Sequence, residues 1–379
     1  MKKMLYILNI ANRVNNFSYT SMKAAQELGF DYHIAGNWKY ANDQERIEDE
    51  KKYGIHIYQI DFVRTPYHPG NVKAYKQLKE IVEREKFDVI HCNTPIGGVV
   101  GRLLGKSCKV PTVIYQAHGF HFYNGAPVLN WMIYYPIERW LAHYTDALIT
   151  INQEDFERAQ SFKLRNHGKV YYVPGVGLDP AVYHISEDVR QKKREELGLK
   201  NDDIALISAG DLVKRKNYQI SVKSIAQAKN KRLQYYICGT GPEEDNLKEL
   251  AKQLNADNQV HFLGFRSDMK ELFGAADIFL FSTLQEGLPR SLSEAMASGL
   301  PCVASKIRGN IDLIQDGIGG TLCSADDVAA YSTAINQLAS DADLRKKMKE
   351  ANLKRIRSFD NEAAEHALLS IYRSIMAVS

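Results

Sequence analysis

Two glutamates eight positions apart, Glu286 and Glu294, are the strongest chemical signal in this sequence of 379 residues. Glu286 follows an apolar segment typical of a strand, and a Gly-Leu-Pro turn then leads into a helical pattern that contains Glu294. The free N–H groups of such a turn and the helix dipole favour an anion between the two acids. A carboxylate there can accept hydrogen bonds from the hydroxyl groups of a sugar or a ribose. Either acid alone would be interpreted as structural, but the whole segment favours a binding site.

A basic turn at 210–217 carries a second signal. Three consecutive cations, Lys214, Arg215 and Lys216, follow a candidate strand that ends at Gly210 and precede a candidate helix. Ammonium and guanidinium groups neutralise phosphate and the charge that develops on a departing phosphate. The turn therefore predicts a diphosphate clamp, and the competing interpretation is a solvated basic turn.

A glycine pair, Gly239 and Gly241, follows another candidate strand and precedes a helical pattern that begins near Glu243. Glycines in this place let the backbone approach a nucleotide at the start of a helix. The segment lacks the third glycine of a dinucleotide fingerprint, which argues against an NAD enzyme.

A histidine, His118, stands at the carboxyl end of the candidate strand 112–116 and is followed by Gly119. We expect its ring to point into a ligand cleft, where it could donate a hydrogen bond to a hexose hydroxyl. A single histidine is more often structural than catalytic, and the same holds for His121.

These motifs carry a family resemblance. The sequence resembles the retaining family 4 glycosyltransferases of the GT-B fold, whose hallmark is Glu-x7-Glu, matched by Glu286 and Glu294. The resemblance extends over nearly the full chain and is closest to the bacterial capsule and exopolysaccharide branch. The matching segments are 91–98, 117–122, 150–152, 173–177 and 308–310.

The resemblance implies roles on the donor side. In such enzymes the first glutamate contacts the donor hexose and the second holds the ribose, roles that pass to Glu286 and Glu294. Lys216 matches the family's phosphate-binding lysine, whereas Asp211 stands where the family has arginine, so Arg215 or Arg290 would replace it. The other residues implied near the nucleotide sugar, UDP-linked by family habit, are Gly239, Gly241, Phe265, Arg266, Leu288 and Pro289.

The resemblance also implies a mechanism and an acceptor side. His118 becomes a functional residue, and the leaving diphosphate accepts the acceptor's proton during same-face attack, without a metal or another cofactor. The acceptor-side candidates are Asn15, Asn16, Thr94 and His121.

Short apolar runs that alternate with amphipathic stretches must position all of these residues. The runs at 4–10, 32–35, 55–60, 89–93, 112–116, 147–151 and 170–173 predict strands of a first domain, and those at 204–210, 234–239, 260–263, 278–281, 302–304 and 320–323 predict a second. Helical patterns between them, among them 19–28, 72–85, 129–143 and 217–228, indicate parallel sheets covered on both faces.

Two doubly wound Rossmann-like α/β domains are therefore expected, facing each other across a cleft in the GT-B architecture. A Pro/Gly-rich pause at 173–180 places the boundary: 1–180 forms an acceptor-binding domain and 181–360 a donor-binding domain. A terminal helix at about 361–379 is predicted to pack back on the first domain, with a cap on the second as the alternative.

The composition excludes several classes of protein. With 45% hydrophobic residues and no low-complexity tract, the chain is neither disordered nor fibrous. Five cysteines without a Cys-x-x-Cys pair indicate neither a disulfide framework nor a zinc site, and they fit a reducing cytoplasm. The apolar start is broken at Asn9, which favours a buried strand over a signal peptide, and no segment approaches the roughly 20 apolar residues of a membrane span.

An aromatic, partly basic segment at 124–140 suggests where an acceptor would be met. Its composition suits a bilayer interface and equally an ordinary core helix. Because relatives of the capsule branch extend a saccharide on polyprenyl diphosphate, we expect such an acceptor and peripheral binding to the inner face of the cell membrane, with no nucleic-acid partner. The net charge of +4 falls entirely within the first 180 residues. Two other functions stay open: a nucleotide-sugar epimerase on the same scaffold, and a protein that binds a nucleotide sugar without turnover.

Overall fold

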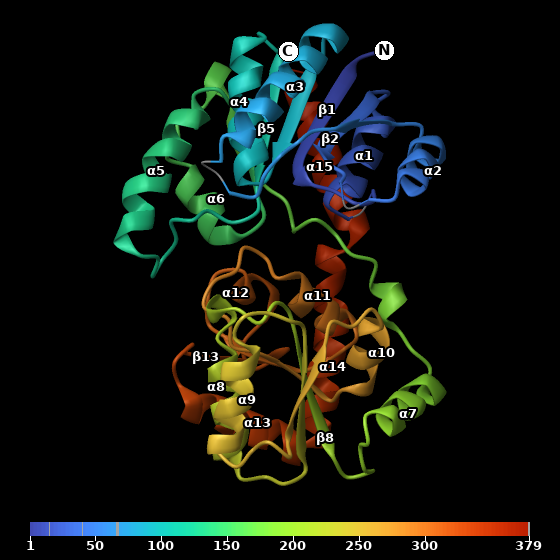
Figure 1. The fold of residues 1–379 in the computed structure, drawn as a ribbon, viewed down its shortest axis with the longest axis vertical. Coiled ribbons are helices and arrows are strands. Elements are labelled where there is room, and N and C mark those ends of the chain that lie inside the picture. The colour runs from blue at the N-terminus through green and yellow to red at the C-terminus, as the bar shows by residue number, and fades with distance from the viewer. Residues whose placement is uncertain (15, 40, 66–67, 378–379) are drawn as a thin grey trace. The chain divides into compact units, whose positions relative to one another are not determined.

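The computed structural model describes residues 1–14, 16–39, 41–65 and 68–377, which form two compact α/β units (Figure 1). The first unit contains the chain up to Gly177 together with the C-terminal segment from Asn361, and the second unit is Leu178–Asp360. The sequence analysis placed the boundary after residue 180.

The first unit is built on a seven-stranded parallel sheet with the strand order β3-β2-β1-β4-β5-β6-β7. Its strands are β1 Lys3–Ile10, β2 Asp31–Asn37, β3 His56–Gln59, β4 Val89–Asn93, β5 Thr112–Ala117, β6 Ala147–Thr150 and β7 Lys169–Tyr172. Its helices are α1 Asn16–Glu27, α2 Asp43–Tyr53, α3 Gly70–Glu85, α4 Pro95–Ser107, α5 Val128–Ala142, α6 Gln153–Ala159, the 3-10 turn η1 Arg165–His167 and, from the far end of the chain, α15 Asn361–Met376.

The C-terminal helix α15 packs against α1 and is anchored by a buried hydrogen-bond network. The Tyr372 hydroxyl lies 2.7 Å from Nδ1 of His91 on β4 and 2.7 Å from the Ser21 hydroxyl on α1. The Tyr32 hydroxyl donates to the same serine at 3.0 Å. Because buried polar groups are costly without partners, these bonds specify where the last helix docks.

The second unit has a six-stranded parallel sheet with the order β10-β9-β8-β11-β12-β13. Its strands are β8 Ile204–Ala209, β9 Leu233–Cys238, β10 Val260–Gly264, β11 Ile278–Phe281, β12 Cys302–Ser305 and β13 Gly320–Cys323. Its helical elements are η2 Pro180–Tyr183, α7 Glu187–Glu196, η3 Lys214–Lys216, α8 Tyr218–Ala228, α9 Glu244–Gln253, α10 Met269–Ala275, α11 Arg290–Ala297, α12 Asn310–Leu313, α13 Val328–Ser340, α14 Ala342–Arg355 and η4 Ile356–Phe359.

Each sheet has an apolar cluster on both of its faces, as β11 illustrates. Ile278 and Leu280 join the cluster under α8 and α13, whereas Phe279 and Phe281 join the cluster under α10 and α11. A strand that is buried on both faces has a continuous run of apolar residues in its sequence. For this reason the short apolar runs predict parallel strands.

All thirteen predicted strands are present, each within two residues of its predicted ends, so the predicted fold class of two parallel α/β domains is confirmed. The sequence analysis named no helical pattern at α4, where glycines interrupt the apolar periodicity. A Cβ atom at Gly98 would lie 2.3 Å from the Tyr115 ring, one at Gly101 2.4 Å from Cys92 Cβ, and one at Gly105 2.2 Å from Val113 Cγ2. The glycines therefore let α4 lie directly on β4 and β5, and tight packing outweighs their poor helix propensity.

None of the described helices combines the length and apolar character needed to cross a bilayer.

Candidate active site

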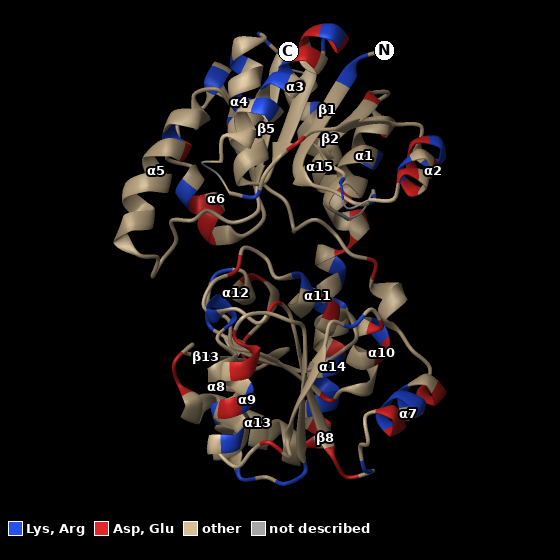
Figure 2. Cartoon of the chain, in the orientation of Figure 1, with Lys and Arg blue, Asp and Glu red and all other residues tan. Residues whose placement is uncertain are grey.

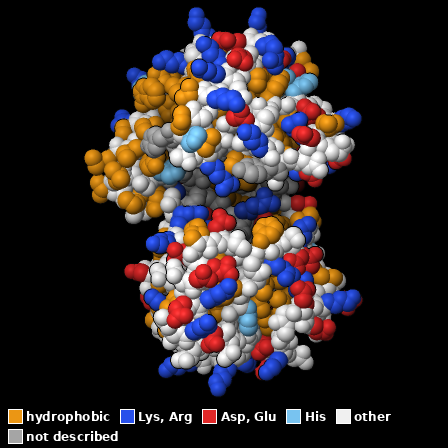
Figure 3. Space-filling model, viewed as in Figure 1, with side chains coloured by type: hydrophobic (Ala, Val, Ile, Leu, Met, Phe, Trp, Pro, Cys, Tyr) orange, Lys and Arg blue, Asp and Glu red, His pale blue; other side chains and the backbone are white. Residues whose placement is uncertain are grey.

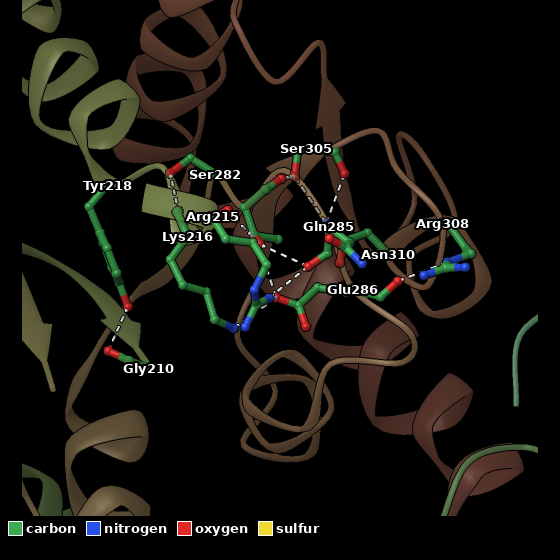
Figure 4. Close-up of polar contacts among 11 residues, drawn as sticks. Gly210, Arg215, Lys216, Tyr218, Ser282, Gln285, Glu286, Ser305, Arg308 and Asn310 are labelled. Atoms are coloured by element: carbon green, nitrogen blue, oxygen red, sulfur yellow. Dashed lines mark hydrogen bonds and ion pairs between the residues drawn. The ribbon is translucent and has the colours of Figure 1, made fainter. Parts of the chain in front are cut away.

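Glu286 stands at the centre of a charged cluster at the carboxyl ends of β8 and β11 (Figure 4). Its Oε1 atom lies 2.7 Å from Lys216 Nζ and 3.1 Å from Arg215 Nη1, and it accepts a 2.9 Å hydrogen bond from Thr283 Oγ1. Within the described residues, Oε2 of Glu286 accepts no hydrogen bond. The structure thus joins one predicted acid to two predicted cations and leaves one carboxylate oxygen for a ligand.

The loop that carries Glu286 is also held through its backbone. Arg215 Nη1 donates to the Gln285 carbonyl at 2.8 Å, and Arg308 Nε donates to the Glu286 carbonyl at 3.0 Å. At Gly309, φ is +81° and a Cβ atom would lie 2.5 Å from the Gly287 carbonyl oxygen. The segment 308–310, noted in the sequence only as a matching segment, therefore positions the glutamate.

The cluster carries more positive than negative charge. Lys216 and Arg215 contribute two cations beside the single carboxylate of Glu286, and Lys216 is largely shielded from solvent. An excess of positive charge at a partly buried site attracts an anionic ligand such as a diphosphate. Asp211, where the resemblance would place a cation, is exposed.

The glycine pair predicted from the sequence brings neighbouring loops into backbone contact. A Cβ atom at Gly239 would lie 2.0 Å from the Gly210 carbonyl oxygen, and one at Gly241 2.4 Å from the Leu212 carbonyl oxygen. The Gly239 N–H donates to the Gly264 carbonyl at 2.7 Å. Only glycine permits these approaches, so the ends of β8, β9 and β10 form one continuous backbone surface beside the basic turn.

Glu294 and Arg290 form a separate pair on α11. Arg290 Nε lies 2.7 Å from Glu294 Oε1, one helical turn away. Burial and the nearby Glu294 carboxylate raise the pKa of Tyr183, which belongs to η2 and packs against α11. Of the two arginines considered from the sequence, Arg290 is therefore paired with Glu294. Arg215 is paired with Glu286, together with Lys216.

The other predicted donor-side residues differ in their surroundings. Leu288 packs against the apolar cluster beneath α11, and Pro289 is the residue before that helix. Phe265 is 82% exposed. Arg266 Nη2 is paired with Asp268 Oδ2 at 2.5 Å and with Glu196 Oε1 at 2.8 Å, so its charge is already neutralised by acids of its own turn and of α7.

His118 in the first unit is paired with a residue that the sequence did not single out as a site residue. Its Nε2 atom lies 3.0 Å from Asn93 Oδ1 at the end of β4, and its Nδ1 atom is buried without a hydrogen-bond partner among the described residues. Burial lowers the pKa of His118 to about 4, so the ring is neutral near pH 7. With the Asn93 oxygen accepting, the proton sits on Nε2 and Nδ1 is left as an acceptor. With this tautomer His118 would accept a hydrogen bond from a hydroxyl, whereas the sequence analysis expected it to donate one.

The other acceptor-side candidates are Thr94, His121, Asn15 and Asn16. Thr94, next to Asn93, has φ +64°, a strained conformation for a β-branched residue, at the start of α4. The His121 ring packs 4.6 Å from the Tyr134 ring of α5. Asn15 and the side chain of Asn16 lie outside the described residues.

Two buried histidines make the first unit sensitive to acid. Burial lowers the pKa of His91 to about 3 and that of His118 to about 4, against about 6.5 in an unfolded chain. As the pH falls below about 6.5, the unfolded state takes up protons that the folded state does not, so stability falls by about 1.4 kcal/mol per pH unit for each histidine. We expect a lower urea midpoint at pH 5.5 than at pH 7.5. Tryptophan fluorescence reports the urea midpoint of the first unit, because Trp38, Trp131 and Trp140 all lie in that unit.

The variant His118→Gln is the matched comparison for that prediction, because it removes one titrating group and keeps a polar side chain. Its unfolding should take up about one proton fewer across the same interval. An equal pH dependence in both proteins would contradict the assignment.

One group of residues could hold a metal ion. Among the described residues, three donor atoms of Asp31, His33 and His56 lie within 4.8 Å of one another. They are on β2 and β3, apart from the two clusters described above. The sequence analysis indicated no metal site, because these residues form no recognisable spacing motif.

Comparison with known families and curated proteins gives matches across both units. Residues 6–152 match the family described as glycosyl transferase 4-like, and residues 189–355 match the family glycosyl transferases group 1. EpsD of Bacillus subtilis (strain 168), which carries a glycosyltransferase name, is 34% identical over 99% of this chain and 97% of its own length. An Escherichia coli protein named UDP-Gal:alpha-D-GlcNAc-diphosphoundecaprenol alpha-1,3-galactosyltransferase is 26% identical over 80% of this chain and 82% of its own.

Solved structures share the fold at lower identity. HepE of Anabaena, solved in complex with UDP and glucose, superposes with a TM-score of 0.79 at 19% identity and covers 99% of this chain and 100% of its own. Sucrose-phosphate synthase of Thermosynechococcus elongatus gives 0.82 at 17% identity over the full length of both chains.

Proposed function

We infer the function of this chain from its family: it belongs to the glycosyltransferases and has their two-domain GT-B architecture. We propose that it transfers a hexose-type sugar from a nucleotide sugar, with UDP as the nucleotide, to a saccharide carried on polyprenyl diphosphate. We further propose that the transfer retains the anomeric configuration and serves capsule or exopolysaccharide synthesis.

The single observation that carries the donor assignment is the cluster around Glu286. A nucleotide sugar presents a diphosphate next to a polyhydroxylated ring, and the cluster offers cations beside a carboxylate oxygen without a partner. Lys216 and Arg215 would neutralise the diphosphate, and Oε2 of Glu286 would accept a hydrogen bond from a hexose hydroxyl. The UDP and glucose in the HepE structure support this choice of ligand.

The remaining donor contacts follow from the same surface. We propose that Glu294 holds the ribose while Arg290, 2.7 Å away, fixes the position of its carboxylate. The backbone of 239–241 and of the Gly264–Phe265 turn would pass along the nucleotide, because the glycines leave no side chain in the way. Arg266 would contribute through its backbone, since its guanidinium is occupied by Asp268 and Glu196.

The proposed reaction needs no enzyme nucleophile. The bond between the anomeric carbon and the diphosphate oxygen breaks, the acceptor oxygen bonds to the same face of that carbon, and the acceptor proton passes to the leaving diphosphate. Glu286 is assigned a binding role, in which Oε1 holds two cations and a hydroxyl and Oε2 accepts a hydrogen bond from the donor sugar. Lys216 and Arg215 stabilise the charge that develops on the leaving group, which is the main catalytic requirement.

The first unit offers a sugar-binding group of its own, His118. Its neutral ring, oriented by Asn93, would accept a hydrogen bond from a sugar hydroxyl at Nδ1. This proposal explains why a buried ring nitrogen has no partner among the described residues, since a buried polar atom is costly until a ligand satisfies it.

An apolar face of α5 supports a membrane-bound acceptor. Val128, Leu129, Met132 and Trp140 are each more than half exposed, and the helix carries no charged residue before Glu138. Figures 2 and 3 show this uncharged, hydrophobic surface on α5. An exposed apolar helix face with an aromatic residue suits the bilayer interface, and the diphosphoundecaprenol substrate in the E. coli relative's name supports a lipid carrier.

Vesicle sedimentation tests the membrane proposal. The protein should bind vesicles that contain anionic lipid, and the variant Met132→Asp should bind at least about tenfold more weakly, because it places a charge in the apolar face. Val72→Asp, which alters an exposed apolar residue of α3, is the matched control and should bind like the wild type. Equal binding by both variants, or no binding by the wild type, would refute docking through α5.

Release of UDP from a panel of UDP-sugars, with membrane extract as acceptor, tests the function itself. Transfer requires acceptor, so we expect release to rise at least tenfold when extract is added. Incubation without acceptor separates the alternatives: an epimerase would convert the sugar alone, and a binding protein without turnover would do nothing in either condition. No observation in the structure favours either alternative.

A further inference from the structure

Three metal-ligating side chains meet on one face of the first unit's sheet. Asp31 and His33 are two positions apart on β2, so their side chains point to the same face. His56 on the edge strand β3 pairs in register with His33, which places it on that face as well. All three lie at or near the amino-terminal ends of their strands, whereas His118 and Asn93 lie at the carboxyl ends of β5 and β4.

The donor atoms of the three residues lie close enough together for one metal ion to contact all three. His33 Nε2 lies 3.0 Å from Asp31 Oδ2, and His56 Nε2 lies 3.5 Å from Asp31 Oδ1. Zinc bonds to nitrogen and oxygen of about 2.0–2.1 Å, arranged tetrahedrally, put neighbouring ligand atoms about 3.3 Å apart. The two histidine nitrogens approach different oxygens of the Asp31 carboxylate, and the donor atoms of all three residues lie within 4.8 Å of one another.

The buried histidine nitrogen in this group lacks a proper hydrogen bond. His33 is only 2% exposed, and its Nε2 atom makes no hydrogen bond among the described residues despite its closeness to the Asp31 carboxylate. A nitrogen and an oxygen 3.0 Å apart that do not point at each other are expected when both are directed at a third atom. A bound cation would satisfy the nitrogen, which is otherwise costly to bury.

The surroundings of His33 favour its role as a ligand. Its other nitrogen, Nδ1, lies 3.1 Å from the Tyr58 hydroxyl, and a hydrogen bond donated by Nδ1 to that hydroxyl would leave the lone pair on Nε2. The neighbouring cation, Lys3, is paired with Glu85 at 2.9 Å, so its charge is largely balanced.

We propose that Asp31, His33 and His56 bind a divalent transition-metal ion, with zinc the best match to two imidazoles and one carboxylate. The His56 side chain is 59% exposed, so water completes the coordination. The site ties the edge strand β3 to β2. Its role is structural, because Glu286, Lys216 and His118 take no part in it.

Zinc binding to the full-length protein, purified without a histidine tag, tests this proposal. Titration calorimetry with zinc chloride alone should show one site, and zinc should raise the thermal midpoint of the first unit, followed by tryptophan fluorescence. His56→Ala should weaken binding at least 30-fold without unfolding the protein, because this imidazole is exposed. His143→Ala, which removes an exposed histidine elsewhere in the same unit, should bind zinc like the wild type.

Substitution with cobalt gives a readout independent of stability. The cobalt-loaded protein should show the visible absorption of a four-coordinate ion, and His56→Ala should lose it. Wild-type protein that binds no zinc would overturn the proposal. Zinc binding by His56→Ala that is as tight as in the wild type would also overturn it. An equal loss of zinc affinity in His56→Ala and His143→Ala would overturn it as well, because it would indicate binding to scattered surface histidines.

Discussion

Replacing Glu286 with glutamine should lower kcat for sugar transfer by about 10³-fold, the size of effect seen when one preorganised electrostatic group is removed from an active site. The carboxylate holds Lys216 and Arg215 within 3.1 Å of one oxygen, and an amide cannot attract both cations. The cations would then lose the positions from which they stabilise the leaving diphosphate. Steady-state UDP release at saturating donor and acceptor measures the change.

The matched control for that experiment is Glu350→Gln, which removes an exposed acid from α14 in the same unit and should leave kcat unchanged. Lys216→Met should also reduce kcat strongly, and the double variant should lose little more than either single variant, because the two residues act as a pair. Activity of Glu286→Gln near that of the wild type, in a correctly folded protein, would contradict the assignment of Glu286.

Replacing Arg102 with methionine should destabilise the first unit by about 3–5 kcal/mol, which would consume much of the stability of a typical domain. Arg102 on α4 has no exposed surface, and its guanidinium makes two bonds to Glu138 of α5, at 2.7 and 3.2 Å. It also donates to the Gly98 carbonyl and lies over the Tyr115 ring, 3.8 Å from its centroid. Without it, the Glu138 carboxylate would be left partly buried without its counter-charge. Urea unfolding followed by tryptophan fluorescence measures the loss.

Two comparisons make this second prediction specific. The double variant Arg102→Met/Glu138→Leu should recover part of the stability, because an apolar pair of similar volume leaves no uncompensated charge. Arg84→Met breaks an exposed ion pair with Glu85 and should cost less than about 1 kcal/mol. If Arg102→Met has the same urea midpoint as the wild type, the buried pair of Arg102 and Glu138 does not hold α4 and α5 together.

The fold could be predicted from the sequence because its determinants are local. Continuous apolar runs such as 278–281 are buried on both faces in a parallel sheet, and amphipathic stretches between them form the covering helices. Helices α4 and α2 were not named in the sequence analysis, because neither has a clear apolar periodicity. Helix α4 is rich in glycine because it lies directly on the sheet, and α2 is so highly charged that its apolar positions form no face.

The candidate site was predicted only in part, for the same physical reason. Glu286 and Lys216 are recognisable because each follows a strand end and their residue types suit a sugar diphosphate. Thr283 and Arg308, which hold Glu286, have no such signal. The direction of the His118 hydrogen bond could not be predicted either, since it depends on Asn93, which lies 25 positions earlier on another strand.

The sequence by itself therefore determined the two parallel sheets and the family, and it supplied the candidate residues for binding a nucleotide sugar, because apolar periodicity and strand-end motifs act over short distances. Only the tertiary structure decided which of these residues meet. Strand order and register bring Lys216 to Glu286, bury Arg102 against Glu138 and place His56 beside His33. These contacts depend on how distant segments pack, and no spacing along the chain encodes them.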